Sequence, residues 1–171
     1  MNKKNIFLIG PLGVGKTTIG RQLAKRAHLI FYDSDQEIEK LTGVSITTIF
    51  EIEGESGFRK REQSVIDNLT SLDSIVLSSG GGSVLAPENR AAFSARGTVI
   101  YLRASLETQL QRTNQRKGTR PLLNHENPFD TIVELNRIRG PLYESIANHT
   151  YDTDKESPQD IAEDIFRMLT S

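Results

Sequence analysis

The segment GPLGVGKTT, residues 10–18, has the residue types and spacing of a loop that binds phosphate. It satisfies the pattern GxxxxGK[ST], and it directly follows the apolar run IFLI. Glycines let successive backbone N–H groups turn inward around phosphate oxygens, Lys16 brings positive charge to the outer phosphates, and the Thr17 hydroxyl is placed to bind Mg²⁺. The alternative is an ordinary glycine-rich turn. The complete motif between a strand and a helix favours a nucleoside triphosphate with Mg²⁺ as the ligand.

Two acidic residues follow the second predicted strand, in the segment YDSDQEIEK. Asp33 and Asp35 lie where a parallel sheet presents ligands, beyond the carboxyl ends of its strands. One acid can hold Mg²⁺ while the other accepts a proton or hydrogen bond from an attacking hydroxyl. The alternative is that the segment only opens a helix, with Ser34 as N-cap and Glu37 as its capping-box partner. We expect both roles to be present.

An arginine and a glutamate are neighbours in the segment GESGFRKRE. We predict that Gly57 starts a helix in which Arg59 and Glu62 lie one turn apart. An arginine oriented by a glutamate can bind a carboxylate through two parallel hydrogen bonds. Taken alone, such a pair is more often a solvated ion pair on a helix surface.

Glycines and further arginines complete the set of candidate residues. The three glycines 80–82 follow the third predicted strand, so backbone can approach a ligand there without side chains in the way, although a flexible turn is the alternative. Arg59, Arg120 in TRPLL and Arg139 in RIRGPLYE supply more positive charge than a triphosphate with Lys16 and Mg²⁺ needs. We therefore expect the second substrate to be an acid.

These residues need a scaffold, and the chain has the length for one compact domain. It has 171 residues, of which 36% are hydrophobic, and short β-rich runs alternate with helical stretches, as in a parallel α/β sheet. The predicted strands cover residues 6–9, 30–33, 75–78, 99–102 and 149–152. The last helix has Ser157 as N-cap and Pro158 in its first turn. Leu102, Leu106 and Leu110 mark the inner side of a helix that runs to about Arg116, and residues 118–128 read as a long loop typical of a lid.

Composition excludes several classes of partner. The formal net charge of −1, from 21 basic and 22 acidic residues, gives no general attraction to nucleic acid or anionic membrane. There are no cysteines, and the apolar run near the start is too short for a signal peptide. We expect a cytoplasmic protein that binds neither nucleic acid nor membrane.

Six motifs in this order and spacing resemble the shikimate kinase family: GPLGVGKTT, DSD, FRKRE, SSGGG, TRPLL and RGPLY. The resemblance implies an α/β fold, the three-layer α/β/α P-loop kinase fold, with a five-stranded parallel sheet ordered 2-3-1-4-5. Residues 1–171 would form one domain, with a substrate-binding segment at about 34–62 and a lid at about 113–127. It also implies a monomer in which ATP phosphorylates the 3-hydroxyl of shikimate, giving shikimate 3-phosphate on the route to aromatic amino acids.

The resemblance also assigns roles to individual residues. The shikimate site would comprise Asp35, Arg59, Gly81, Gly82 and Arg139. The ATP site would comprise Gly13, Val14, Gly15, Lys16, Thr17, Thr18, Arg112, Arg120 and Pro158. Catalysis would use Lys16, Asp35 and Arg120, and Mg²⁺ would be held by Thr17 and Asp33. The stretch TNQRKGT, residues 113–119, is one residue longer than in some family members, which bears on lid contacts and leaves the reaction unaffected.

Other classes of P-loop protein fit the sequence less well. A regulatory GTPase needs an NKxD motif, which the sequence lacks. A motor or nucleic-acid remodeller normally has an aspartate that closes an apolar strand, whereas the third strand here continues as VLSSGGG. The sequence therefore favours phosphoryl transfer to a small molecule. A gluconate or nucleoside kinase on the same fold remains the nearest rival, distinguished only by Asp35, Arg59 and Arg139.

Overall fold

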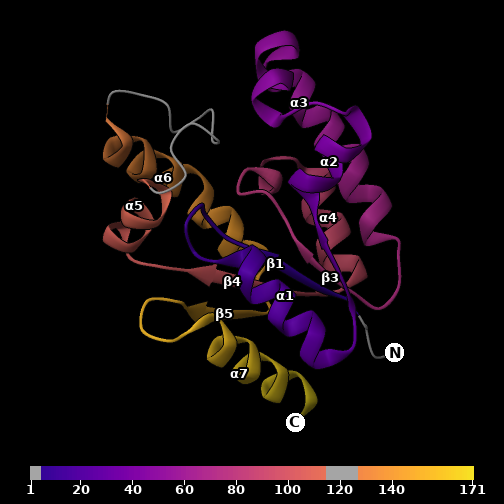
Figure 1. The fold of residues 1–171 in the computed structure, drawn as a ribbon, viewed down its shortest axis with the longest axis vertical. Coiled ribbons are helices and arrows are strands. Elements are labelled where there is room, and N and C mark those ends of the chain that lie inside the picture. Colours follow the sequence, from indigo (N-terminus) through magenta and orange to yellow (C-terminus); the bar gives the residue numbers. More distant parts are fainter. Residues whose placement is uncertain (1–4, 115–126) are drawn as a thin grey trace.

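A computed structural model describes residues 5–114 and 127–171, which form a single sheet covered by helices (Figure 1). The strands are β1 (Ile6–Ile9), β2 (Ile30–Asp33), β3 (Ile75–Ser78), β4 (Thr98–Arg103) and β5 (His149–Asp152). All neighbouring strands are parallel, and their order is β2-β3-β1-β4-β5, which confirms the predicted topology. Most of the predicted lid, including Arg120, lies outside the described residues.

Helices cover both faces of this sheet. They are α1 (Lys16–Ala27), α2 (Ser34–Thr42), α3 (Ile46–Thr70), α4 (Pro87–Arg96), α5 (Leu106–Asn114), α6 (Pro128–Ile146) and α7 (Pro158–Thr170), with a 3-10 turn η1 (Ser83–Leu85). The helices α1 and α7 pack on one face, and α3, α4 and α6 pack on the other. Within the described ranges, no helix combines the length and the apolar character that crossing a membrane requires.

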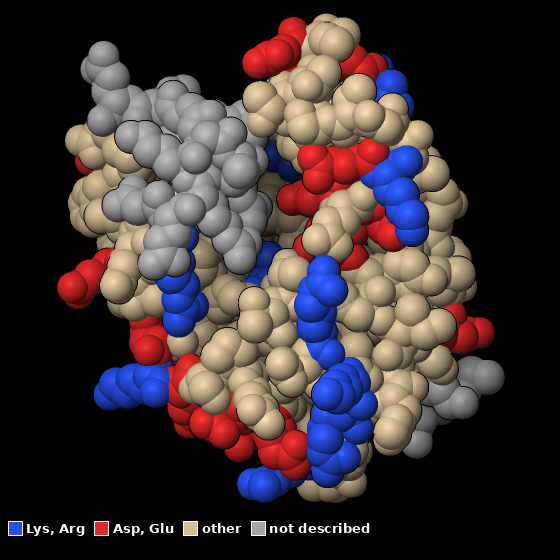
Figure 2. Space-filling model, viewed as in Figure 1, with Lys and Arg blue, Asp and Glu red and all other residues tan. Residues whose placement is uncertain are grey.

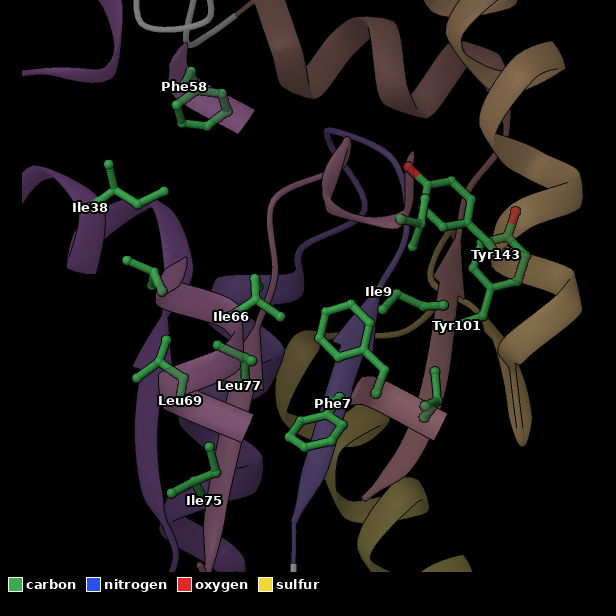
Figure 3. Packing of buried hydrophobic residues seen from close by; sticks show 14 of the residues in the cluster. Phe7, Ile9, Ile38, Phe58, Ile66, Leu69, Ile75, Leu77, Tyr101 and Tyr143 are labelled. Carbon is green, nitrogen blue, oxygen red and sulfur yellow. The ribbon is translucent and has the colours of Figure 1, made fainter. Parts of the chain in front are cut away.

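The position of β1 in the middle of the sheet explains why its sequence is apolar throughout. Phe7 and Ile9 point into the core beneath α3, α4 and α6 (Figure 3). Ile6 and Leu8 point into the core beneath α1 and α7. Side chains alternate between the two faces of a strand, so a strand covered on both faces buries every residue. The sheet is thus anchored from both sides, and the carboxyl ends of β1, β2 and β3 open at one edge.

The helix α5 differs from its prediction in the side that it buries. Leu102 belongs to β4, and Leu110 is only partly buried. The buried residues of α5 are instead Gln109 and Thr113, which lie against the backbone of Gly13. The leucine pattern was misleading because this helix packs on the phosphate-binding loop, whose backbone is polar, and not on the apolar core.

The helix that carries Arg59 begins earlier than predicted and contains a break. It starts at Ile46, after Ser45 as N-cap, so Gly57 lies inside it and does not start it. The break is at Gly54, whose φ of 73° and ψ of −180° are not helical. This backbone conformation is essentially confined to glycine. Gly54 therefore sets the angle between the two parts of α3, residues 46–53 and 55–70.

Gly54 gives a direct test of this break. Replacing Gly54 with Ala should lower the free energy of unfolding by about 1–3 kcal/mol, because the new Cβ is strained at positive φ. No atom lies within 4 Å of that Cβ position, so the loss would come from the backbone conformation alone. Urea denaturation measures it, with the exposed Glu51→Ala as control, for which we expect a change of less than about 0.5 kcal/mol. Equal stability of the two variants would contradict the break.

Candidate active site

A cavity of about 400 Å³ lies at the carboxyl ends of the central strands. The hollow on this side of the molecule is visible in Figure 2, where acidic side chains line the wall on the α3 side. Its lining includes eleven of the predicted site residues: Gly13, Val14, Gly15, Lys16, Thr17, Thr18, Asp33, Asp35, Gly81, Arg112 and Pro158. The motifs GPLGVGKTT, DSD and SSGGG, which are far apart along the chain, therefore meet in one cleft, whereas Arg59, Gly82 and Arg139 are not among the residues that line it.

The phosphate-binding loop joins β1 to α1 as predicted. Lys16 is the first residue of α1, and its Nζ donates hydrogen bonds to the carbonyl oxygens of Gly10 at 2.7 Å and Pro11 at 2.8 Å. Gly15 is the N-cap, and no side chain in the described part of the chain caps this end. The N–H groups of the first helical turn can therefore bind an anion, which the helix dipole also favours.

Asp33 connects the phosphate-binding loop to the second strand. The Thr17 hydroxyl donates to Asp33 Oδ2 at 2.8 Å, and the Ser78 hydroxyl lies 3.4 Å from the Thr17 oxygen. Hydroxyl and carboxylate oxygens are the hard ligands that Mg²⁺ prefers. Within residues 5–114 and 127–171 no group of three or more His, Cys, Asp or Glu could form a complete metal cage. This donor set fits an ion that is held partly by phosphate and water.

The N-cap of α2 is Asp33, which corrects the prediction of Ser34. Asp33 Oδ1 accepts hydrogen bonds from the backbone N–H groups of Asp35 at 2.9 Å and Gln36 at 3.2 Å. Ser34 is instead buried, and its hydroxyl accepts a hydrogen bond from the N–H of Gly80 at 3.0 Å. The capping-box pattern was misleading because the serine is used to tie α2 to the loop after β3.

The three glycines after β3 make room for charged protein groups. A Cβ on Gly80 would lie 2.9 Å from Asp35 Oδ1 and 3.1 Å from Glu62 Oε2, and a Cβ on Gly82 would overlap the Arg59 guanidinium. The sequence analysis assigned these glycines to a ligand. In the structure, their missing side chains also let Arg59 and two carboxylates approach the loop.

Arg59, whose side chain is 20% exposed, and the buried Glu62 form an ion pair that is largely shielded from water, and not the solvated pair that was the alternative. The Arg59 Nη1 to Glu62 Oε1 distance is 2.9 Å, and the Glu62 side chain is 1% exposed. Burial raises the pKa of Glu62 to about 7, with a further increase from the Asp35 charge, while Arg59 and Arg139 pull it down in part. Glu62 was singled out from the sequence only as a partner of Arg59, and its burial was missed.

Arg139 is buried and lies against the neighbouring glycine of the same loop. It is 5% exposed, and its Nη1 lies 3.6 Å from the position of a Cβ on Gly81. Burial lowers the pKa of the Arg139 guanidinium, with the Arg59 charge acting in the same direction. Arg59 and Arg139 therefore flank the loop 80–82 from α3 and α6. A buried arginine in this position is suited to binding an anion, whose negative charge would compensate that of the guanidinium.

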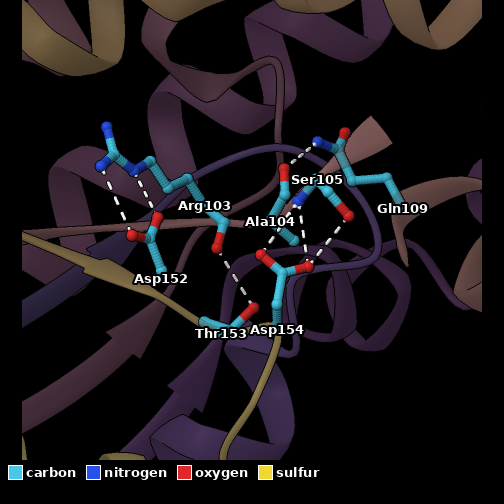
Figure 4. A network of polar contacts seen from close by, with 7 residues as sticks. All are labelled: Arg103, Ala104, Ser105, Gln109, Asp152, Thr153 and Asp154. Atoms are coloured by element: carbon cyan, nitrogen blue, oxygen red, sulfur yellow. Dashed lines mark hydrogen bonds and ion pairs between the residues drawn. The ribbon is translucent and has the colours of Figure 1, made fainter. Parts of the chain in front are cut away.

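The other end of the cleft is built by α5 and α7. Arg112 donates to the carbonyl oxygens of Gly13 at 3.0 Å and Thr153 at 3.0 Å, so it bridges the phosphate-binding loop and the segment after β5. That segment also fixes α5, because Asp154 accepts a hydrogen bond from the N–H of Ser105 (Figure 4). Thr153 is a site residue that the sequence analysis missed, since nothing in its local pattern indicates a contact with Arg112.

The start of α7 completes this end of the cleft. Ser157 caps α7 through a hydrogen bond from the N–H of Asp160 at 3.1 Å, which confirms the predicted cap. Pro158 follows at the first helical position and lines the cavity together with Arg112.

Comparison with known proteins identifies the family. The shikimate kinase family model matches residues 12–170. The chain is 51% identical over 167 residues to the shikimate kinase of Vibrio parahaemolyticus serotype O3:K6, covering 98% of this chain and 96% of that protein. A solved structure of the shikimate kinase from Acinetobacter baumannii in complex with shikimate is 46% identical, with a TM-score of 0.94 and coverage of 97% of this chain and 92% of that chain.

More distant structures share the fold alone. A gluconokinase from Sinorhizobium meliloti 1021 is 18% identical, with a TM-score of 0.61 and coverage of 99% of this chain and 94% of that chain. The order of the strands, the residues that meet in the cleft and these matches agree with one another. The chain therefore belongs to the shikimate kinase family and is an ATP-dependent kinase.

Proposed function

We propose how the described residues carry out the reaction of this family, the transfer of the γ-phosphoryl group of ATP to the 3-hydroxyl of shikimate, giving shikimate 3-phosphate. The observation that supports this most is the position of Arg59, which is partly buried, and Arg139, which is buried, against a glycine loop whose residues 80 and 81 line the phosphate-binding cleft. Turnover of ATP should be assayed with shikimate, gluconate and nucleoside monophosphates. Only shikimate should support turnover, and equal turnover with gluconate would contradict this assignment.

ATP binds at the phosphate-binding loop in this proposal. The backbone N–H groups of residues 13–18 surround the phosphates, and Lys16 moves its ammonium group from the carbonyls of Gly10 and Pro11 to the outer phosphates. Arg112 and Pro158 flank the adenine. Thr17 and Asp33 hold Mg²⁺, directly or through water. When bound, Mg²⁺ neutralises charge on the phosphates.

Shikimate binds at the glycine loop. Arg59 and Arg139 hold its carboxylate, the backbone of Gly81 and Gly82 contacts the ring, and Asp35 accepts a hydrogen bond from the reacting hydroxyl. A carboxylate beside a hydroxyl can orient it for attack and take its proton as the bond to phosphorus forms. Arg120 lies outside the described residues, so its action on the transferring phosphoryl group stays a prediction of the sequence.

The setting of this reaction is also part of the proposal. We infer that the chain acts as a monomer in the cytoplasm, without nucleic acid or membrane as partner. The net charge of −1 supports the absence of nucleic-acid and membrane partners, since it gives no general attraction to polyanions.

Arg59 tests the carboxylate site. Arg59→Lys keeps the positive charge but loses the paired geometry of the guanidinium, so the KM for shikimate should rise roughly tenfold to a hundredfold while the KM for ATP stays within about twofold. Steady-state kinetics measure both. The control is Arg61→Lys on the same helix, because Arg61 pairs with the exposed Glu53, whereas the Arg59 guanidinium lies against Gly82. An unchanged shikimate KM in Arg59→Lys would remove Arg59 from the site.

Asp35 tests the chemical step. Asp35→Asn keeps the size but loses the charge and the strong acceptor, so kcat should fall by about a hundredfold or more. ATP binding, measured by calorimetry, should persist because Asp35 lies at the substrate end. Glu37→Gln, an acid on the same helix outside the cavity lining, serves as control. Near-normal kcat in Asp35→Asn would show that Asp35 does not act in the transfer.

The buried Glu62 predicts a pH dependence of stability. Its pKa is raised in the folded protein from 4.5 to about 7, so the folded protein binds this proton more tightly than the unfolded chain does. Its contribution to the free energy of unfolding is therefore present below pH 4.5 and is lost as the pH rises through about 7. Between pH 5 and 8, the free energy of unfolding of wild type should fall by about 2 kcal/mol relative to that of Glu62→Gln.

Urea denaturation at several pH values between these limits measures the Glu62 effect. The control is Glu55→Gln. Glu55 also pairs with Arg59, but its side chain is exposed. Its stability difference from wild type should not vary with pH in this range. If the free energies of unfolding of wild type and Glu62→Gln change with pH in parallel, Glu62 does not retain its proton on burial.

A further inference from the structure

Tyr143 lies beneath the glycine loop, and the roles assigned so far make no use of it. It is on α6, it is 1% exposed, and its ring stacks on that of Tyr101 from β4 with 5.1 Å between ring centroids (Figure 3). Its hydroxyl donates a hydrogen bond of 2.5 Å to the carbonyl oxygen of Gly81. The ring is therefore held by packing, and the hydroxyl is bound to one of the two glycines assigned to substrate.

The same hydroxyl lies beside Arg139, which precedes Tyr143 by one helical turn. The position of a Cβ on Gly81 is 3.6 Å from Arg139 Nη1 and also 3.6 Å from the Tyr143 hydroxyl oxygen. Arg139 and Tyr143 thus meet the loop at the same residue. Burial raises the pKa of Tyr143, while the charge of Arg139 and a hydrogen bond from it act in the opposite direction. The phenol stays protonated at neutral pH, as a donor must.

Glycine loops lose much conformational freedom when they are ordered, so a loop of three glycines needs fixed points. In this loop the N–H of Gly80 donates to the Ser34 hydroxyl at 3.0 Å, and the carbonyl of Gly81 accepts from Tyr143. The first contact ties the loop to α2, and the second ties it to α6. Ordering the loop before substrate arrives lowers the cost of binding.

We propose that Tyr143 is a positioning residue for substrate, which holds the Gly81 backbone at a set distance from the Arg139 guanidinium so that both meet the same bound acid. This rests on the proposed function, in which Gly81 and Arg139 contact shikimate. Tyr143 touches no substrate atom in this scheme and acts through its two neighbours.

Tyr143→Phe tests this role because it removes the hydroxyl and keeps the ring. The KM for shikimate should rise roughly threefold to tenfold, as for one lost hydrogen bond, while kcat and the KM for ATP stay within about twofold. Tyr101→Phe is the matched control, since it removes a hydroxyl from the same pair of stacked rings. If the two variants only disturbed the packing of the ring pair, both would change the KM for shikimate to the same extent. Equal KM values for shikimate in Tyr143→Phe and Tyr101→Phe would therefore overturn the proposal.

A double-mutant cycle with Arg139→Lys separates positioning from general loss of stability. Arg139→Lys alone should raise the shikimate KM, and adding Tyr143→Phe should then raise it by less than about twofold. A full additional rise would overturn the proposal, because the two residues would then act independently. If Arg139→Lys leaves the KM unchanged, the proposed function itself fails at this residue. If Arg139→Lys raises the KM and Tyr143→Phe does not, only the role of Tyr143 is refuted.

Discussion

The close approach of Arg59 to the backbone of the loop 80–82 is the contact on which the substrate half of the cleft depends. The guanidinium can lie there only because Gly82 has no side chain. It is held in this position by its hydrogen bond to Glu62. Removing a charged pair from water is costly, and an anion that reaches the exposed fifth of the Arg59 side chain would offset part of that cost. In the proposed function, this arrangement therefore serves substrate binding more than stability.

The two ends of the cleft are held by different kinds of contact. At the phosphate end, backbone geometry dominates, because a helix N-terminus and a lysine anchored to carbonyls are set by the turn itself. At the substrate end, side chains from α2, α3 and α6 converge on one loop. The first end is encoded in nine consecutive residues, whereas the second depends on how three helices pack.

This difference explains what the sequence could predict. Strand positions and the phosphate-binding loop were correct because they follow from local patterns and from a motif that is read along one segment. The sheet order, which the resemblance to the shikimate kinase family implied, was also correct. The cap at Ser34, the helix start at Gly57 and the inner side of α5 were wrong, since each depends on what packs against the element. Residues such as Tyr143 and Thr153 contact partners more than 40 positions away, and their local sequence does not indicate this.

Asp33 uses its two carboxylate oxygens for different neighbours, one for the N–H groups that begin α2 and the other for Thr17. Replacements that lack a side-chain acceptor, such as Ala, therefore affect folding and activity together, because they would loosen the first turn of α2 and remove the oxygen donors beside the phosphate-binding loop at once. Asn would keep an acceptor for the N–H groups that begin α2 and would lose the carboxylate charge. In a screen of random variants, inactive chains with most changes at residue 33 would also be less stable, and only Asn would separate the two effects.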